Sequence, residues 1–270
     1  MLAKTKTPKL TIVGAGPGDP DLITVKAIKA IKSADVILYD ALVNIELLNY
    51  ANPKAEIFFV GKRAGCYAYQ QEQINDLIVS RAKSHGHVVR LKGGDPFIFG
   101  RGAEELDYVS DFGIETAMVP GISSSSAVPA YQGIPLTRRG VSESFWVITG
   151  TTKSHLLSED VKVAAQSTAT VVILMGMSKL KEITEVFTLA GKSKMPIAII
   201  QNGTTEFEKS GFGTIETICD VVKDQKLANP AIIIIGDVVA NRARLTSVSK
   251  MALADENTKF NIFDNSAITI

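Results

Sequence analysis

The chain has 270 residues, of which 46% are hydrophobic and 21% are charged, and its formal net charge is +1. These proportions are those of a globular protein with one large domain or two smaller ones, so they exclude wholesale disorder and a fibrous class. The near-neutral charge gives no overall attraction for nucleic acid or an anionic membrane. No apolar run reaches the roughly 20 residues that a membrane helix needs.

The N-terminal residues and the cysteines indicate where the protein works. Residues 1–9 are basic and have no apolar segment behind them, which predicts a flexible arm rather than a secretion signal. Cys66 and Cys219 do not form a close-spaced pair, and the three histidines lack ligand spacing. We therefore expect no disulfide framework, no metal site and a cytoplasmic location.

Short apolar segments alternate with amphipathic ones along the first half of the chain. Apolar residues at helical spacing predict helices near residues 22–31, 74–82 and 103–109. Continuous apolar runs predict five strands, at 10–13, 36–39, 57–60, 88–91 and 116–119. Strands that alternate with helices indicate a mostly parallel sheet covered on both faces.

A second set of elements follows a polar, basic stretch at residues 137–140. Apolar runs predict four more strands, at 145–148, 171–175, 197–200 and 232–235. Apolar residues at helical spacing predict a helix at 180–187. We expect one α/β domain over residues 10–138, a second α/β domain over 139–245, and a polar tail over 246–270.

The first motif with chemical meaning is residues 14–19 (GAGPGD), directly after the first predicted strand. A dinucleotide fingerprint requires a final glycine, and this motif has Asp19 there. Pro17 also removes a backbone N–H that a pyrophosphate would use. The loop therefore suits a neutral or cationic ligand better, and the alternative is a tight Gly-Pro turn.

Four further loops follow the other predicted strands of the first half. Taken singly, Asp40 would be a helix N-cap and Lys62 a solvated surface lysine. Taken together, all five loops lie at the carboxyl ends of strands, where open α/β sheets bind their ligands. The sequence therefore predicts a site at this rim. The four further loops are residues 39–40 (YD), 61–63 (GKR), 92–102 (KGGDPFIFGRG) and 120–126 (PGISSSS).

The second half offers weaker candidates. Met175 ends a predicted strand, where methionine most often fills a core gap but also packs against flat rings and thioethers. Gly203 lies in residues 201–205 (QNGTT) and would let backbone approach a ligand closely.

The motifs GAGPGD, YDALV, VGKRAG, KGGDPFIFGRG, VPGIS, AYQGIPLTRRG and QNGTT occur in the order found in tetrapyrrole methylases. The chain resembles that family over residues 10–240. The resemblance implies a mostly parallel N-terminal sheet, a second mixed α/β domain and a homodimer. It also implies S-adenosylmethionine as methyl donor, bound between the domains, and S-adenosylhomocysteine as product.

The resemblance further implies a small-molecule tetrapyrrole substrate, with neither nucleic acid nor membrane as partner. Within the family the motifs are most similar to those of members that act on uroporphyrinogen III. These members transfer two methyl groups to ring carbons and give precorrin-2 for sirohaem or cobalamin synthesis. The alternative is methylation of another precorrin.

Site residues follow from the family's motifs. Asp40 and Lys62 match its proposed acid–base residues, although both could act purely electrostatically. Residues 123–126 are four serines where relatives mix in alanine or threonine, and Arg138 stands where relatives often carry histidine. Cofactor contacts are expected at Pro17, Gly93, Gly94, Asp95, Ile98, Ser123, Ser124, Met175 and Gly203. The substrate's carboxylates are expected at Arg63, Arg101, Arg138 and Arg139, whose alternative role is surface ion pairing.

Two readings from other classes remain to be tested. A nicotinamide-dependent oxidoreductase is disfavoured by Asp19 in the first glycine-rich loop. A non-catalytic cofactor-binding protein is disfavoured because Asp40 and Lys62 are both present.

Overall fold

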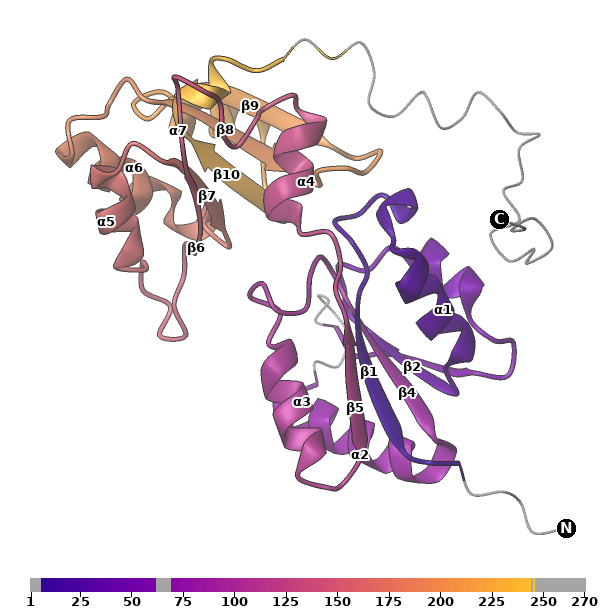
Figure 1. Cartoon of the computed structure of the whole chain (residues 1–270). Helices are drawn as coiled ribbons and strands as arrows, with labels where there is room; N and C mark the ends of the chain where they lie inside the picture. Colours follow the sequence, from indigo (N-terminus) through magenta and orange to yellow (C-terminus); the bar gives the residue numbers. More distant parts are fainter. Residues whose placement is uncertain (1–5, 62–68, 244, 246–270) are drawn as a thin grey trace, which may run out of the picture.

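The computed structural model describes residues 6–61, 69–243 and 245, which form two lobes (Figure 1). The first lobe contains a five-stranded sheet in the order β3-β2-β4-β1-β5, and every pairing in it is parallel. The mostly parallel first sheet predicted from the sequence is therefore confirmed. Its strands are β1 (Lys9–Gly14), β2 (Val36–Tyr39), β3 (Glu56–Phe59), β4 (His87–Lys92) and β5 (Glu115–Val119).

Helices cover both faces of the first sheet. Alternate residues of a strand point to opposite faces, so Ile12 of β1 joins the core beneath one pair of helices while Val13 joins the core beneath another helix. Thr24 caps one helix by accepting a hydrogen bond from the Ala27 N–H at 3.1 Å. The helices are α1 (Val25–Ser33), α2 (Gln71–His85) and α3 (Gly102–Ser110), with short 3₁₀ turns η1 (Pro20–Leu22) and η2 (Ile45–Tyr50).

The second lobe contains a mixed five-stranded sheet in the order β6-β7-β10-β8-β9. Only β6 and β7 pair in parallel, and the other three pairings are antiparallel. The mixed character expected for this domain is confirmed. Its strands are β6 (Phe145–Thr149), β7 (Thr170–Leu174), β8 (Pro196–Gln201), β9 (Lys209–Thr214) and β10 (Ala231–Ile235).

Helices of the second lobe include several that the hydrophobic pattern did not indicate. Helix α6 matches the predicted helix, whereas α4, α5 and α7 were not expected. Strand β9 was also not expected, because Gly211 and Gly213 weaken the strand signal. A Cβ on Gly211 would lie 2.8 Å from Leu227, so the glycine lets the neighbouring layer pack closely. The helices are α4 (Ser124–Tyr131), α5 (Asp160–Gln166), α6 (Leu180–Leu189) and α7 (Ile218–Gln225), with η3 (Met177–Lys179) and η4 (Asp237–Val239).

Helix α4 packs on the second sheet although it directly follows the first (Figure 1). Val128 of α4 shares a buried cluster with Ile200 and Ile234. The chain therefore crosses from one sheet to the other after Val119. A division at residue 138 stays a prediction, and the packing of α4 favours an earlier one.

Within the described ranges, no helix is both long and apolar enough to cross a membrane. Residues 1–5 and 246–270, which fall in the predicted arm and tail, lie outside the described residues.

His87 is held as a neutral imidazole between the first sheet and α1, which makes stability dependent on pH. Its Nε2 lies 2.8 Å from the Thr11 hydroxyl and its Nδ1 lies 3.1 Å from the Ser33 carbonyl oxygen. Burial lowers the pKa of His87 below its ordinary value. The unfolded chain therefore binds this proton first as the pH falls, so the stabilisation is complete above about pH 6.5 and is lost below it.

We expect the free energy of unfolding, measured with urea, to fall between pH 7.5 and pH 5. The variant His87→Gln should be less stable at pH 7.5 and should lose less stability on acidification. His155→Asn, at an exposed position of the second lobe, is the control and should keep the wild-type pH dependence. An unchanged pH dependence in His87→Gln would contradict the assignment.

Candidate functional site

Three glycines cross at the carboxyl ends of the central strands. They are Gly14 at the end of β1, Gly94 after β4 and Gly121 after β5. A Cβ on Gly14 would lie 2.4 Å from the Gly121 nitrogen, and a Cβ on Gly121 would lie 2.2 Å from the Gly94 oxygen. Real Cβ atoms do not approach backbone this closely, so only glycine permits the crossing.

Backbone hydrogen bonds tie these loops together. The Ala15 N–H donates to the Lys92 oxygen at 2.7 Å, and the Gly94 N–H donates to the Gly16 oxygen at 2.7 Å. Asp95 completes the connection, because its Oδ2 accepts from the Gly121 N–H at 3.0 Å. Gly93, Gly94 and Asp95 are therefore brought to the first glycine-rich loop, as the sequence predicted from the shared rim.

Open space borders Gly94 next to the start of α4. A Cβ on Gly94 would meet only the Ser124 nitrogen, at 3.9 Å. Ser123 caps α4 through its hydroxyl, which accepts from the Ser125 N–H at 3.2 Å and lies 2.8 Å from the Ser125 hydroxyl. Unpaired N–H groups in the first turn of a helix favour an acceptor or an anion. The structure thus brings Gly94, Ser123 and Ser124 together around one space.

The second lobe reaches the same loop through residues 203–205. A Cβ on Gly18 would lie 2.7 Å from Thr205, and the Asp19 N–H donates to the Thr204 hydroxyl at 3.2 Å. Tyr131 of α4 donates to Asp19 Oδ2 at 2.7 Å. The glycine-rich loop that contains Pro17 is therefore held by both lobes.

Gly203 has a packing reason of its own. A Cβ at this position would lie 2.4 Å from a methyl carbon of Val128 on α4. The glycine is required for α4 to lie against the 201–205 loop, whether or not a ligand also contacts it.

Asp40 follows β2 directly and is partly exposed. Its N–H donates to the Leu91 oxygen at 3.2 Å, so the backbone continues the sheet by one residue. Its Oδ1 accepts from Arg90 Nη2 at 2.6 Å, and Lys92 Nζ lies 3.6 Å from its Oδ2. A carboxylate that is hydrogen-bonded at one oxygen and ion-paired at the other thus stands at the rim of the parallel sheet.

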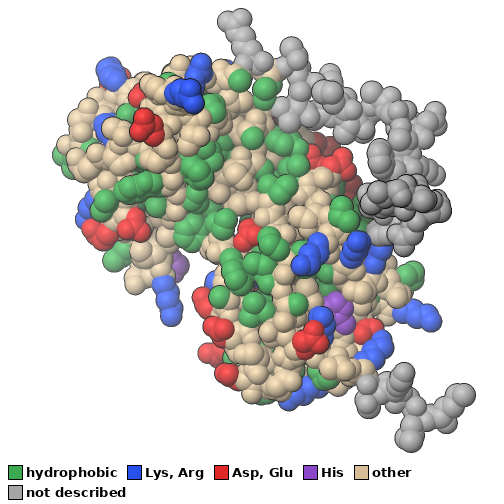
Figure 2. Space-filling model, in the orientation of Figure 1, with side chains coloured by type: hydrophobic (Ala, Val, Ile, Leu, Met, Phe, Trp, Pro, Cys, Tyr) green, Lys and Arg blue, Asp and Glu red, His purple; other side chains and the backbone are tan. Residues whose placement is uncertain are grey.

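Large apolar side chains are exposed at the strand ends. Phe97, Ile98 and Phe99 protrude after β4, Ile122 after β5 and Met175 after β7. Figure 2 shows the molecule hollowed between the two lobes, with hydrophobic side chains on both sides of the hollow. Met175 has a positive φ of 55° and its carbonyl oxygen accepts from the Thr151 hydroxyl. The residue is half exposed, so this methionine does not fill the core as methionines usually do.

The predicted substrate arginines lie in different parts of the molecule. Arg101 begins α3 and its guanidinium pairs with Glu104 at the surface. Arg138 and Arg139 lie in the exposed turn before β6, and Arg138 Nη1 donates to the Asn241 oxygen at 2.6 Å. Lys62 and Arg63 lie outside the described residues.

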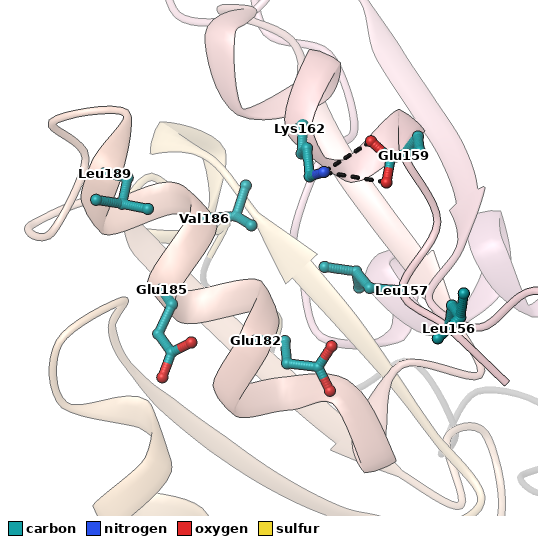
Figure 3. A pocket seen from close by; sticks show the side chains of 8 residues that line it. All are labelled: Leu156, Leu157, Glu159, Lys162, Glu182, Glu185, Val186 and Leu189. Carbon is teal, nitrogen blue, oxygen red and sulfur yellow. Dashed lines mark hydrogen bonds and ion pairs between the residues drawn. The ribbon is translucent and has the colours of Figure 1, made fainter.

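A separate groove of about 360 Å³ lies on the outer surface of α5 and α6 (Figure 3). Leu156, Leu157, Val186 and Leu189 line it, with Lys162 paired to Glu159 at one side. None of the site residues predicted from the sequence lies in this groove, and it is away from the glycine crossing. In the described part of the chain, no group of three or more His, Cys, Asp or Glu side chains is placed to hold a metal ion.

A parallel sheet with a glycine crossing at its carboxyl ends, joined to a mixed α/β lobe, places the chain among two-lobed α/β proteins with a ligand site at the sheet rim. The chain belongs to the tetrapyrrole (corrin/porphyrin) methylases, whose family profile matches residues 9–219. This confirms the resemblance that the motifs indicated.

Individual relatives narrow the comparison. The uroporphyrinogen-III C-methyltransferase of Methanocaldococcus jannaschii is 45% identical over 235 residues, which cover 86% of this chain and 97% of that protein. The crystal structure of uroporphyrin-III C-methyl transferase from Thermus thermophilus, complexed with S-adenyl homocysteine, is 34% identical with a TM-score of 0.75, covering 86% of this chain and 99% of that one. A cobalt precorrin-4 methyltransferase is 28% identical with a TM-score of 0.76, covering 86% and 95%.

Several residues at the site were not singled out from the sequence. Tyr131 and Thr204 hold the glycine-rich loop from the second lobe, and nothing in their local sequence marks this contact. Arg90 and Glu105 lie beneath Asp40. The sequence could have indicated that Arg90 belongs to a buried charged group, because a charged residue inside an apolar strand needs a buried partner.

Tyr131 connects the lobes through a phenol whose proton is tightly held. Burial and the hydrogen bond to Asp19 raise the pKa of Tyr131 to about 12. Because this exceeds the unfolded value of about 10, the stabilisation is present below pH 10 and is lost as the pH rises toward 12.

We expect a tyrosine titration followed at 295 nm after a rapid pH jump to show a step near pH 12 that Tyr131→Phe removes. The control Tyr50→Phe, at a more exposed position on η2, should keep that step. A step of full amplitude in Tyr131→Phe would show that the phenol of Tyr131 is not the group concerned.

Proposed function

We propose that this chain transfers two methyl groups from S-adenosylmethionine to ring carbons of uroporphyrinogen III and so produces precorrin-2. The observation that carries the proposal is the 45% identity over 86% of the chain to a relative named for that activity. The arrangement of the glycine loops, with Asp40 beside them at the same sheet rim, supports it from the geometry.

The residues at the glycine crossing fit S-adenosylmethionine. The space beside Gly94 has no side chain filling it and is bordered by the Ser124 N–H at the start of α4, which suits the donor's carboxylate or adenosine hydroxyls. The exposed side chains of Ile98 and Met175 offer apolar surface for the flat adenine ring. When bound, the donor supplies a methyl group on a sulfonium, which is a good leaving group. Residues proposed to hold it are Pro17, Gly93, Gly94, Asp95, Ile98, Ser123, Ser124, Met175 and Gly203.

Asp40 is the proposed proton acceptor of the site. Attack by a pyrrole carbon leaves the macrocycle with a proton to lose, and a partly exposed carboxylate at the sheet rim is placed to take it. Lys62 is proposed as the accompanying proton donor on the strength of the sequence motif. Alignment of the reacting atoms supplies much of the remaining rate enhancement.

Arginines are proposed to hold the substrate's eight carboxylates. Arg101 comes from the first lobe, whereas Arg138 and Arg139 come from the second, and all three are exposed. A guanidinium binds a carboxylate through two parallel hydrogen bonds, so each could orient one substituent. Arg63 is proposed for the same role from its place in the sequence.

Methylation of another precorrin is the second candidate function. The similarity to a cobalt precorrin-4 methyltransferase, with a TM-score of 0.76, favours keeping it. We also propose a cytoplasmic homodimer, which light scattering coupled to size-exclusion chromatography would test by a mass of twice the 29.0 kDa chain.

Anaerobic incubation with uroporphyrinogen III and methyl-labelled S-adenosylmethionine should add two labelled methyl groups to the tetrapyrrole. Mass spectrometry of the product measures this directly. Retained binding of S-adenosylhomocysteine without transfer would reject uroporphyrinogen III as substrate and favour another precorrin.

Replacing Asp40 by Asn should lower kcat roughly 100-fold, the usual contribution of a general base. The Kd of S-adenosylhomocysteine, measured by calorimetry, should stay within about twofold, because the change removes a charge without removing volume. Asp76→Asn is the matched control, since Asp76 accepts a hydrogen bond from Tyr108 on the surface of α2. A kcat for Asp40→Asn equal to that of the control would remove Asp40 from the reaction.

A further inference from the structure

Four charged side chains meet on one face of the first sheet. Arg90 and Lys92 are two residues apart on β4 and therefore point to the same face. Arg90 stands opposite Leu38 of β2, and Asp40 follows Leu38 by two residues, so its side chain lies on that face as well. Glu105 reaches the group from α3, which packs on this face.

The contacts within the group give each carboxylate oxygen of Asp40 its own cation. Arg90 Nη2 lies 2.6 Å from Oδ1, and Lys92 Nζ lies 3.6 Å from Oδ2. The Asp40 backbone is fixed at the same time by its hydrogen bond to Leu91. The carboxylate is thus constrained in both position and rotation.

Glu105 fixes the two cations from behind. Its Oε1 accepts from Lys92 Nζ at 2.8 Å and from Gln71 Nε2 at 3.1 Å. Its Oε2 lies 3.4 Å from Arg90 Nε, an ion-pair contact without hydrogen-bond geometry. Two cations and two anions leave the group without net charge.

Burial of these charges differs sharply from one end of the group to the other. The side chains of Glu105, Arg90 and Lys92 are 0%, 2% and 6% exposed, whereas that of Asp40 is 28% exposed. Removing charges from water offsets most of their mutual attraction, so such a group contributes little net stability over apolar residues of similar size. What a buried, paired network does secure is one orientation of its members.

We propose that Arg90 is a positioning residue for Asp40, and that Glu105 and Lys92 hold its guanidinium in place for that task. This inference rests on the proposed function only for the identity of the reaction. It assigns three buried side chains to the geometry of Asp40, the partly exposed member of the group.

The competing explanation is that the group merely fastens α3 to the sheet. Loss of Arg90 would then weaken the fold without altering the Asp40 side chain. Crystal structures of the wild type and of Arg90→Met separate the two, and they do so without any substrate. We expect the Asp40 carboxylate to turn away from its wild-type position in Arg90→Met, and an unmoved carboxylate overturns the proposal.

Kinetics give a second, independent measurement. In Arg90→Met we expect kcat to fall by roughly 100-fold, the effect of misplacing a reacting group by about 1 Å. The Kd of S-adenosylhomocysteine should change by less than about twofold, because the glycine crossing is untouched. Arg90→Lys keeps the charge with a shorter reach and should recover part of kcat.

A double variant tests whether Arg90 acts through Asp40. Arg90→Met added to Asp40→Asn should lower kcat no further than Asp40→Asn alone, whereas independent effects would multiply. Ile12→Val is the control for loss of packing, because Ile12 stands opposite Arg90 on the neighbouring strand, is fully buried, and carries no charged or hydrogen-bonding side-chain group. It should lower the thermal midpoint and leave kcat unchanged.

The outcomes distinguish this inference from the proposed function. If the wild type does not methylate uroporphyrinogen III, the proposed function fails, and the crystal structures still decide the role of Arg90. If the wild type is active and Arg90→Met has the wild-type kcat, the positioning role is wrong. The positioning role is also wrong if the double variant loses kcat by the product of the two single losses. Should Arg90→Met fail to fold, Arg90→Lys and Glu105→Gln are to be compared by the same two measurements.

Discussion

The absence of three side chains determines the arrangement of the site. Gly14, Gly94 and Gly121 bring three backbone segments within distances that no Cβ would tolerate. The loops after β1, β4 and β5 consequently behave as one unit, joined by backbone hydrogen bonds and by the Asp95 carboxylate. A parallel sheet always brings its carboxyl ends to one edge, but it does not make the loops touch. In this chain the three glycines allow the loops to contact one another, and this contact positions the start of α4.

The first glycine-rich loop also determines how the second lobe meets the first. Asp19 accepts from Tyr131 and donates through its backbone to Thr204, so one residue is fixed by two segments of the other lobe. The same loop is hydrogen-bonded to Gly94 on its other side. Any shift of the second lobe would therefore be felt at the loop proposed to border the methyl donor.

The sequence predicted those features that depend on local periodicity. Buried strands read as apolar runs, and the loops after them were located because parallel strands share one edge. It did not predict α4, whose serines and Pro129 give a weak helix signal and whose stability comes from packing Val128 into the second sheet. Nor did it predict β9, because Gly211 lowers the strand propensity of this segment. The absence of a side chain at Gly211 lets α7 approach closely.

The composition of the site was predictable only in part. The motif placed Asp40 and Gly94 at the rim, and both are there. The pairing of Arg90 with Glu105 was missed because it depends on how α3 packs on the first sheet, a contact between distant segments that no local pattern encodes. Gly203 was predicted from the motif as a ligand contact, whereas its proximity to Val128 is enough to require a glycine for packing. A residue in a motif can have two reasons to be there, and the sequence distinguishes them poorly.

Between residues 69 and 243 the chain passes from the first lobe to the second once, which has a consequence for synthesis. All five strands of the parallel sheet are encoded before residue 120, and all five of the mixed sheet after it. The N-terminal lobe can therefore assemble on the ribosome while its partner is still being translated, because domains generally fold as units in the order in which they emerge. Residues 203–205 arrive roughly eighty positions later. The glycine-rich loop can therefore be built on its first-lobe side before the segment that contacts Gly18 and Asp19 from the second lobe has been synthesised.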